Sequence, residues 1–167
     1  MSAVTLLTYG CASIHPGAAP MLHADDAVAV ATMMNYSDTP DAGRSAEHIA
    51  ANVLRASGLK DVELAESTAD AAAVFDTLKH GAAENDIAWA RSRKFTYLMT
   101  GAVEEWHYKT GVDGEPVVAM TFELVDVATG RTVWSSTGTR SGWSRSGLTN
   151  VAQQLITQML QAVHAGT

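Results

Sequence analysis

Short apolar runs alternate with amphipathic helical patterns in the first half of the chain. The run from Ala27 to Met34 is continuously apolar, as is typical of a strand that is buried on both faces. From Ser45 onward, apolar residues recur every three or four positions, which predicts a helix capped by Ser45 that ends before Gly58. A short strand is expected over residues 62–67.

Two further helical stretches follow, one that begins near Ser67 and one that covers residues 86–93. Strand patterns then replace the helical ones. A long strand is expected over residues 96–108, a clearly alternating strand over 118–124, and a third strand over 131–140. Because short loops rich in Gly, Asp and Pro join these three strands, they are predicted to form an antiparallel meander.

The last pattern is a helix from Leu148 to Val163 with a wide apolar face. Its polar face carries Gln, Asn and Thr, and no charged residue precedes His164. This absence of charge reflects either composition alone or contact with a neighbouring subunit, where charged residues are depleted. The complete order, β-α-β-α-β-β-β-α, predicts a single α/β (α+β) domain with one mixed sheet of about five strands and helices packed on it.

The first 22 residues differ in character from the rest. Residues 12–22 contain two Pro and one Gly and predict an extended tether, so the folded domain is expected over residues 23–167. Cys11, the only cysteine, follows a short apolar stretch, and Gly10 fits the small residue that precedes the lipidated Cys of bacterial lipoproteins. No Lys or Arg precedes Cys11. We therefore consider residues 1–22 a signal remnant and tether with a candidate lipidation site, and an unmodified Cys11 is the alternative.

The charge distribution is uneven. The formal net charge is −7, which argues against nucleic acid as a partner because such proteins present a basic surface. All 18 Asp and Glu residues lie at or before Asp126, whereas the remaining segment contains three Arg and no acid. This asymmetry is either a chance skew or an acidic surface that faces a cationic ligand.

The chain contains none of the common catalytic or metal-binding motifs. The nearest candidate for acid–base chemistry is His107, which follows Glu105 on the same strand and lies near Glu104. A histidine and a carboxylate at a strand end usually form only a solvated pair. We therefore expect no enzymatic activity, no metal ion and no cofactor, and a hydrolase that uses His107 and Glu105 is the alternative.

One tryptophan stands apart from the others. Trp143 lies in a Ser/Gly-rich loop between Arg140 and Arg145, a setting that suits a bilayer interface or the pocket of a partner. The alternative is a loop that folds back on the domain. The other three tryptophans fall inside predicted elements and are expected in or near the core: Trp89, Trp106 and Trp134.

The segment from Trp89 to Gly138 carries a resemblance to a known group. It contains YLMTGAV at residues 97–103, FELVD at 122–126 and TGRTVWS at 129–135. This pattern resembles periplasmic outer-membrane lipoproteins related to the N-terminal domain of TolB and to CsgG. Within that group, the length, the near-terminal Cys and the Arg-flanked Trp are most similar to the export lipoproteins of the Pel exopolysaccharide system.

The resemblance implies a periplasmic protein anchored to the outer membrane that forms a ring-shaped homo-oligomer, with a dodecamer as one candidate size. An electronegative face of the ring would guide a cationic polysaccharide to an outer-membrane porin, PelB, during biofilm formation. By the same resemblance, Cys11 would be acylated and Trp143, with its flanking Arg140 and Arg145, would contact the inner leaflet of the outer membrane. A scaffold lipoprotein of another secretion or envelope assembly is the alternative.

The charge pattern suggests where such a polymer would bind. Exposed carboxylates of the predicted meander are the candidates, because a cationic chain would be held by many weak contacts with them. The expected polysaccharide-binding residues are Glu104, Glu105, Asp113 and Glu115.

Overall fold

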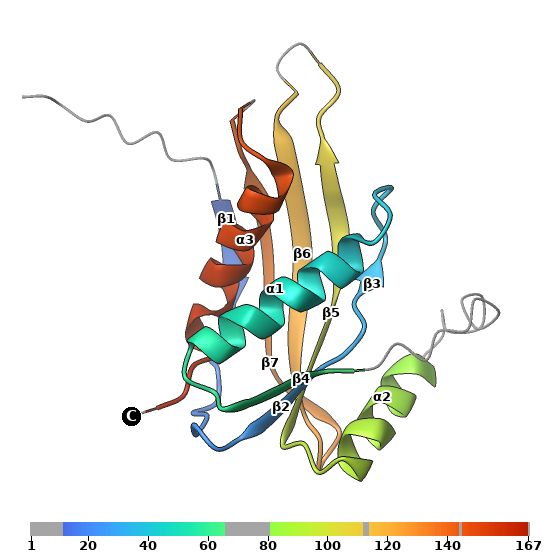
Figure 1. Ribbon diagram of the computed structural model, residues 1–167, viewed down its shortest axis with the longest axis vertical. Helices are drawn as coiled ribbons and strands as arrows, with labels where there is room; N and C mark the ends of the chain where they lie inside the picture. The colour runs from blue at the N-terminus through green and yellow to red at the C-terminus, as the bar shows by residue number, and fades with distance from the viewer. Residues whose placement is uncertain (1–11, 66–80, 112–113, 144, 167) are drawn as a thin grey trace, which may run out of the picture.

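The computed structural model describes residues 12–65, 81–111, 114–143 and 145–166, and these form one mixed sheet with helices on it (Figure 1). The seven strands are β1 (Ala12–Pro16), β2 (Ala27–Val30), β3 (Met34–Asn35), β4 (Asp61–Leu64), β5 (Tyr97–Tyr108), β6 (Pro116–Asp126) and β7 (Arg131–Ser141). The helices are α1 (Ala42–Ala56), α2 (Gly81–Ser92) and α3 (Leu148–Met159), and a 3₁₀ turn, η2 (Leu160–Ala162), extends α3. The strand order is β1-β7-β6-β5-β2-β4, and β3 also pairs with β5. The predicted class, a single α+β domain with a mixed sheet, is confirmed.

The antiparallel meander of β5, β6 and β7 is the centre of the sheet, as the sequence predicted. Its strands pair along almost their whole length, from Tyr97 opposite Asp126 to Tyr108 opposite Pro116. A tight turn joins β6 to β7 because Gly130 adopts φ +70° and the Asp126 carboxylate accepts hydrogen bonds from the amide and hydroxyl of Thr129. These bonds lower the pKa of Asp126.

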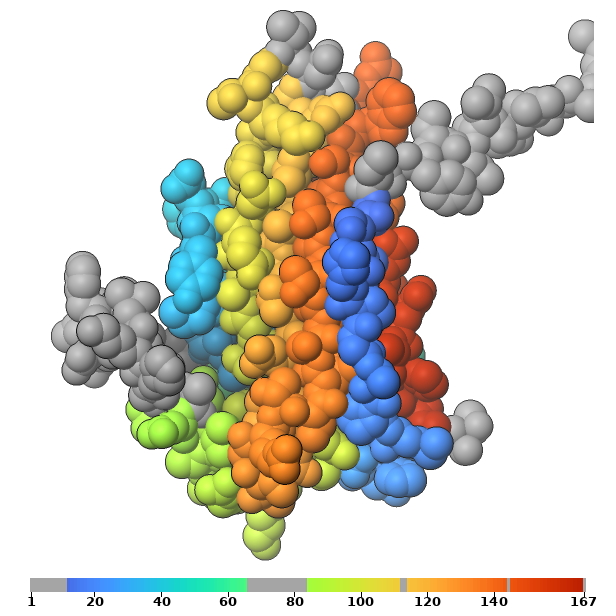
Figure 2. Space-filling model, turned by 180° about the vertical axis from the view of Figure 1, so that it is seen from behind, coloured from blue at the N-terminus to red at the C-terminus, as the bar shows by residue number. Residues whose placement is uncertain are grey.

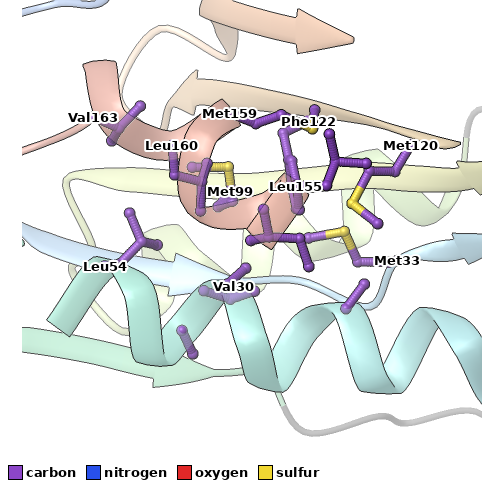
Figure 3. Packing of buried hydrophobic residues seen from close by; sticks show 14 of the residues in the cluster. Val30, Met33, Leu54, Met99, Met120, Phe122, Leu155, Met159, Leu160 and Val163 are labelled. Carbon is purple, nitrogen blue, oxygen red and sulfur yellow. The ribbon is translucent and has the colours of Figure 1, made fainter. Parts of the chain in front are cut away.

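Helices α1 and α3 cover one face of the sheet and enclose the main core with it. Figure 3 shows Leu155 and Met159 of α3 directed at Met120 and Phe122 of β6. The contact between α3 and β7 is close because Gly138 has no side chain: a Cβ at this position would lie 2.8 Å from Met159 Sδ.

The opposite face of the sheet is covered differently. Helix α2 packs on one end of it, where Trp89 stacks on Phe95 with ring centroids 5.4 Å apart, next to buried Leu98 and Val125. Away from α2, toward the end of the sheet where β5 ends and β6 begins, none of the three helices described lies over this face of β5, β6 and β7 (Figure 2). The sheet is therefore buried on both sides at one end and on one side at the other.

Two parts of the sheet differ from the expectation. Residues 12–16 are extended, as a tether would be, but they pair with β7 and form an edge strand, so the sheet begins ahead of residue 23. The predicted strand from Ala27 to Met34 is divided into β2 and β3, which both pair with β5. These additional strands account for seven strands in place of the predicted five.

The start of α1 also differs. The sequence indicated Ser45 as the cap, but α1 begins at Ala42 and its N-cap is Asp41, whose φ is +59°. The additional turn brings Gly43 against the carbonyl oxygen of Met33. A Cβ at this position would lie 2.5 Å from that oxygen, so only glycine allows this approach. The predicted helix end at Gly58 is confirmed. Helix α2 begins earlier than residue 86, and the helix predicted near Ser67 falls outside the described residues.

Glu47 of α1 is a buried carboxylate with a structural role. Its side chain is 8% exposed, and its Oε1 accepts a hydrogen bond of 2.7 Å from the Met33 amide in the gap between β2 and β3. It thus satisfies a backbone donor that the break in the strand would leave unpaired. Burial raises the pKa of Glu47 from its ordinary value, although the bond from Met33 opposes this effect.

The raised pKa of Glu47 predicts a pH-dependent effect of Glu47→Gln. Glu47 ionises less readily in the folded protein than in the unfolded chain. The wild type therefore loses stability as the pH rises from 4.5, the ordinary pKa of Glu, through the raised pKa of folded Glu47. Glu47→Gln retains an acceptor for Met33 and removes the charge, so its gain in unfolding free energy should be present at pH 7 and vanish near pH 4. Urea denaturation at several pH values measures this difference.

Glu47→Ala provides the matched comparison. It removes the acceptor as well as the charge, so it should cost about 1–3 kcal/mol through the unpaired Met33 amide and the lost packing. A Glu47→Gln variant that is less stable than wild type at pH 7 would contradict this account.

Candidate membrane-facing end and acidic sheet face

Trp143 lies on a short loop that is firmly attached to the end of the meander. Its side chain is 58% exposed, so it does not fold back into the core. The loop is held by hydrogen bonds from the Gly142 amide to the Pro116 carbonyl oxygen (2.9 Å) and from the Ser146 amide to the Trp143 carbonyl oxygen (2.7 Å). A large aromatic side chain is therefore displayed to solvent next to Gly142, whose amide is bonded to β6.

Two neighbouring positions keep this loop close to the domain. A Cβ at Gly142 would lie 2.5 Å from Val151 Cγ2 and 2.9 Å from Pro116 Cγ, so a side chain there would displace the loop. At the start of α3, the Leu148 amide donates to the Tyr108 hydroxyl at 3.2 Å, which gives a partner to one of the unpaired amides of the first helical turn. The ends of β5 and β6 thus determine where Trp143 is presented.

The N-terminal strand begins at the same end of the molecule. Ala12 of β1 is the register partner of Arg140, three residues before Trp143. Cys11 lies outside the described residues, but it is covalently joined to Ala12. A lipid on Cys11 would therefore attach the protein at the end that displays Trp143.

The two arginines that flank Trp143 have different settings. Arg145 is exposed in the loop, whereas the Arg140 guanidinium turns toward α3 and donates a 3.1 Å hydrogen bond to Gln158 Oε1. Arg140 also pairs with Val118, whose side chain belongs to the main core, so it lies on the helix side of the sheet. The structure thus places Arg145, but not Arg140, beside Trp143 on the loop.

Two of the predicted acidic residues lie on the sheet face that α1 and α3 leave uncovered. A bulge between Val103 and Glu105 places Glu104 as an extra residue in β5. Glu104 Oε1 accepts a hydrogen bond of 3.0 Å from the Thr121 hydroxyl, which is 3.1 Å from the Thr137 hydroxyl. A chain of hydrogen-bonding groups therefore runs across β5, β6 and β7 and orients the Glu104 carboxylate.

Glu105 and one further carboxylate share this face. Glu105 lies opposite Ala119, and Glu123 lies opposite both Thr100 and Ser135. We call the surface formed by Glu104, Glu105 and Glu123 the acidic sheet face. Glu123 was not among the predicted binding residues, although its place on the polar side of an alternating strand could have indicated it.

The remainder of the acidic sheet face consists mainly of small polar side chains. Its hydroxyl groups come from three strands: Ser13 of β1, Thr121 of β6, and Ser135, Thr137, Thr139 and Ser141 of β7. Strands β1, β5 and β6 contain no Lys or Arg, and the two arginines of β7 are Arg131 at its first position and Arg140 on the helix side of the sheet. The local charge is therefore negative.

The other two predicted acidic residues do not join this surface. Glu115 lies in the hairpin between β5 and β6 and forms an ion pair of 3.3 Å with Lys109, which offsets its charge. Asp113 lies outside the described residues. The predicted set of four is thus split, and Glu104 and Glu105 are the two that the fold brings together.

The structure also places the candidate acid–base pair, His107 and Glu105. His107 and Glu105 are both exposed, and in the described part of the chain no hydrogen bond joins them. Residues 12–65, 81–111, 114–143 and 145–166 include no group of three side chains that could hold a metal ion. No helix within those ranges is long and apolar enough to cross a membrane.

Comparison with solved structures identifies the family. The chain matches the PelC dodecamer from Paraburkholderia phytofirmans at 48% sequence identity, over 94% of this chain and 100% of that chain, with a TM-score of 0.82. This chain belongs to the PelC family. A point variant of the same PelC gives 49% identity over 93% of this chain and a TM-score of 0.82.

More distant similarity extends the fold beyond PelC. Lipoprotein GNA1162 from Neisseria meningitidis is 13% identical over 83% of this chain and 97% of that chain, with a TM-score of 0.55, which shows a shared fold alone. No protein-family model and no curated protein sequence matches the chain. The assignment to the PelC family therefore rests on the solved PelC structures.

Exposure separates the roles of two tryptophans in this PelC-family protein. Trp134 is 3% exposed and its indole N–H donates to the Gly17 carbonyl oxygen at 3.1 Å. Trp134→Ala should therefore cost about 3–5 kcal/mol of unfolding free energy. Trp143→Ala should change it by less than about 0.5 kcal/mol, because its ring is mostly in water. Urea denaturation of both variants tests this contrast, and comparable losses would refute it.

Proposed function

We propose that this protein is a lipid-anchored subunit of a ring beneath the outer membrane that guides a cationic exopolysaccharide, Pel, toward an outer-membrane porin, PelB. The observation that carries this proposal is the match to the PelC dodecamer over almost the whole chain, at an identity of 48%. The match covers 100% of the PelC chain with a TM-score of 0.82, which supports the same assembly for this chain. We therefore propose a dodecamer for this protein as well.

The end that carries Trp143 faces the membrane in this proposal. Trp143 and Arg145 contact the headgroup region, and the acyl chain on Cys11 enters the same leaflet, because β1 begins at that end of the sheet. A lipid on Cys11 would hold the protein at one point only, and a second contact at the same end would fix its orientation on the bilayer. Tryptophan suits that contact because its ring is apolar and its N–H is polar.

The acidic sheet face binds the polymer in this proposal. Glu104, Glu105 and Glu123 are accessible, and each contributes little binding energy because exposed charges are screened by water and salt. Repetition around a ring multiplies these weak contacts, so the polymer is retained while each local contact exchanges rapidly. The Thr and Ser hydroxyls on the same face provide hydrogen bonds to a sugar chain.

The membrane contact is tested with vesicles and a chain that carries Cys11→Ser, which cannot be acylated. We expect this protein to bind vesicles of phosphatidylethanolamine and phosphatidylglycerol, and the added Trp143→Ala change to lower the partition coefficient about tenfold, which corresponds to about 1.4 kcal/mol. In the producing bacterium, Trp143→Ala should reduce secreted Pel at an unchanged protein level.

The control for this experiment is Val133→Ala, which removes an exposed apolar side chain near the start of β7, whereas Trp143 follows the other end of that strand. It should retain vesicle binding and secretion. Unchanged vesicle binding by the Trp143→Ala protein would exclude Trp143 as the membrane contact.

The acidic sheet face is tested with chitosan oligomers, a defined cationic polysaccharide. The combined Glu104→Gln and Glu123→Gln variant should bind these oligomers at least tenfold more weakly at low salt, and the difference should shrink as salt increases. The matched control is Glu63→Gln with Asp61→Asn, which removes two charges from β4 at the far edge of the sheet. Equal losses in both double variants would indicate a general effect of net charge and would contradict a specific binding face.

A further inference from the structure

The proposed ring requires two different surfaces on each protomer. Identical subunits that close into a ring contact one another head to tail, so a patch on one copy meets a different patch on the next. The membrane-facing end and the acidic sheet face are already occupied in the proposed function. The two lateral edges of the sheet remain: one carries β1 and α3, and the other carries β3 and the loop that follows it (Figure 1).

The exposed surface of α3 is unusual for a helix in water because none of its side chains is ionisable. We call the following exposed residues the α3 surface: Thr149, Asn150, Gln153, Gln154, Thr157 and Gln158. A groove of about 630 Å³ separates α3 from α1, and the apolar side chains of Ile49, Val53 and Leu160 line it. Gln153 and Thr157 border this groove and also a second one of about 380 Å³ beside Arg140. Depletion of charge around an apolar groove is typical of an interface core.

The opposite edge displays an exposed aromatic residue on a well-ordered loop. Tyr36 is 62% exposed, and its amide donates to the Val103 carbonyl oxygen at 2.8 Å. The side chain of Asn35 closes the loop by donating to the Thr39 carbonyl oxygen (2.9 Å) and accepting from the Ser37 hydroxyl (2.7 Å). The Thr39 hydroxyl in turn donates to the Trp106 carbonyl oxygen. Such a loop loses little conformational freedom when it binds.

The charges of the two edges are complementary. Residues 36–41, which we call the Tyr36 loop, include the exposed carboxylates of Asp38 and Asp41 and no cation. The α3 surface has no acid to repel them, and Arg140 lies on its border. Helix α1, on the other side of the groove, exposes Arg55 in its last turn, while its one acid, Glu47, is buried. Arg44 lies in the first turn of α1 and so follows the Tyr36 loop instead.

We propose that the Tyr36 loop of one copy docks on the α3 surface of the next, with Tyr36 in the groove beside Gln153 and its carboxylates toward Arg140, and that this contact closes the ring. The inference rests on the ring of the proposed function and specifies its interface. It leaves the acidic sheet face free to line the polymer path and Trp143 free to face the membrane.

The test uses the full chain in detergent, with native mass spectrometry and light scattering. Tyr36→Ala and Gln153→Lys should each reduce the assembly to single chains, whereas Thr139→Lys, which adds the same charge on the acidic sheet face, should retain the ring. Circular dichroism and thermal unfolding check that all three variants are folded, which is expected because each site is exposed and Lys is a good helix former.

A mixture of the two interface variants makes the test specific. Tyr36→Ala retains an intact α3 surface and Gln153→Lys retains an intact Tyr36 loop, so the mixture should form a one-to-one heterodimer and nothing larger. A ring that persists in either variant overturns the inference, as does a mixture without heterodimers. A wild-type chain that is monomeric would instead refute the ring itself, and intact rings in the variants would refute only this interface.

Discussion

The alternation of apolar and polar residues along β6 is the constraint on which the rest of the structure depends. Met120, Phe122 and Leu124 point to α1 and α3, while Thr121 and Glu123 point the other way. Because β6 is the central strand of the meander, its two faces set the chemistry of the whole sheet. One face must be covered by helices, and the other can remain in water beyond the small area that α2 covers.

This unequal coverage gives the protomer several surfaces with distinct properties. The helix layer leaves the acidic sheet face open, and the ends of β5 and β6 hold the Trp143 loop. The lateral edges carry the α3 surface and the Tyr36 loop. A membrane contact, a polymer path and a neighbour-to-neighbour contact can therefore be made simultaneously, because each uses a different direction.

The sequence predicted the meander, the class of the fold and the exposure of Trp143, because these depend on local periodicity and loop composition. It could not predict β1, since residues 12–16 contain one large apolar side chain, Ile14, and their strand is made by backbone pairing with β7. Pro16 at its last position is compatible with an edge strand. The break between β2 and β3 likewise depends on a distant residue, Glu47, which supplies the missing acceptor.

The bulge in β5 explains why the faces of that strand could not be assigned from sequence. Met99 and Val103 face the main core at odd positions, and Trp106 does so at an even one, so the alternation changes phase between them. A regular strand would have sent Glu104 and Glu105 to opposite faces. The extra residue instead leaves both near the same open surface, and no pattern in the sequence marks where it is inserted.

The same geometry determines how strongly the acidic sheet face can hold a polymer. Exposed carboxylates attract a cation with only about 1 kcal/mol at 4 Å in water, and physiological salt reduces this further. One protomer therefore cannot retain a polymer chain for long. The hydrogen bond from the Thr121 hydroxyl reduces the freedom of the Glu104 side chain without burying it, so the contact stays weak but directed. Retention with movement then depends on the number of copies, which links the chemistry of this face directly to the oligomeric state.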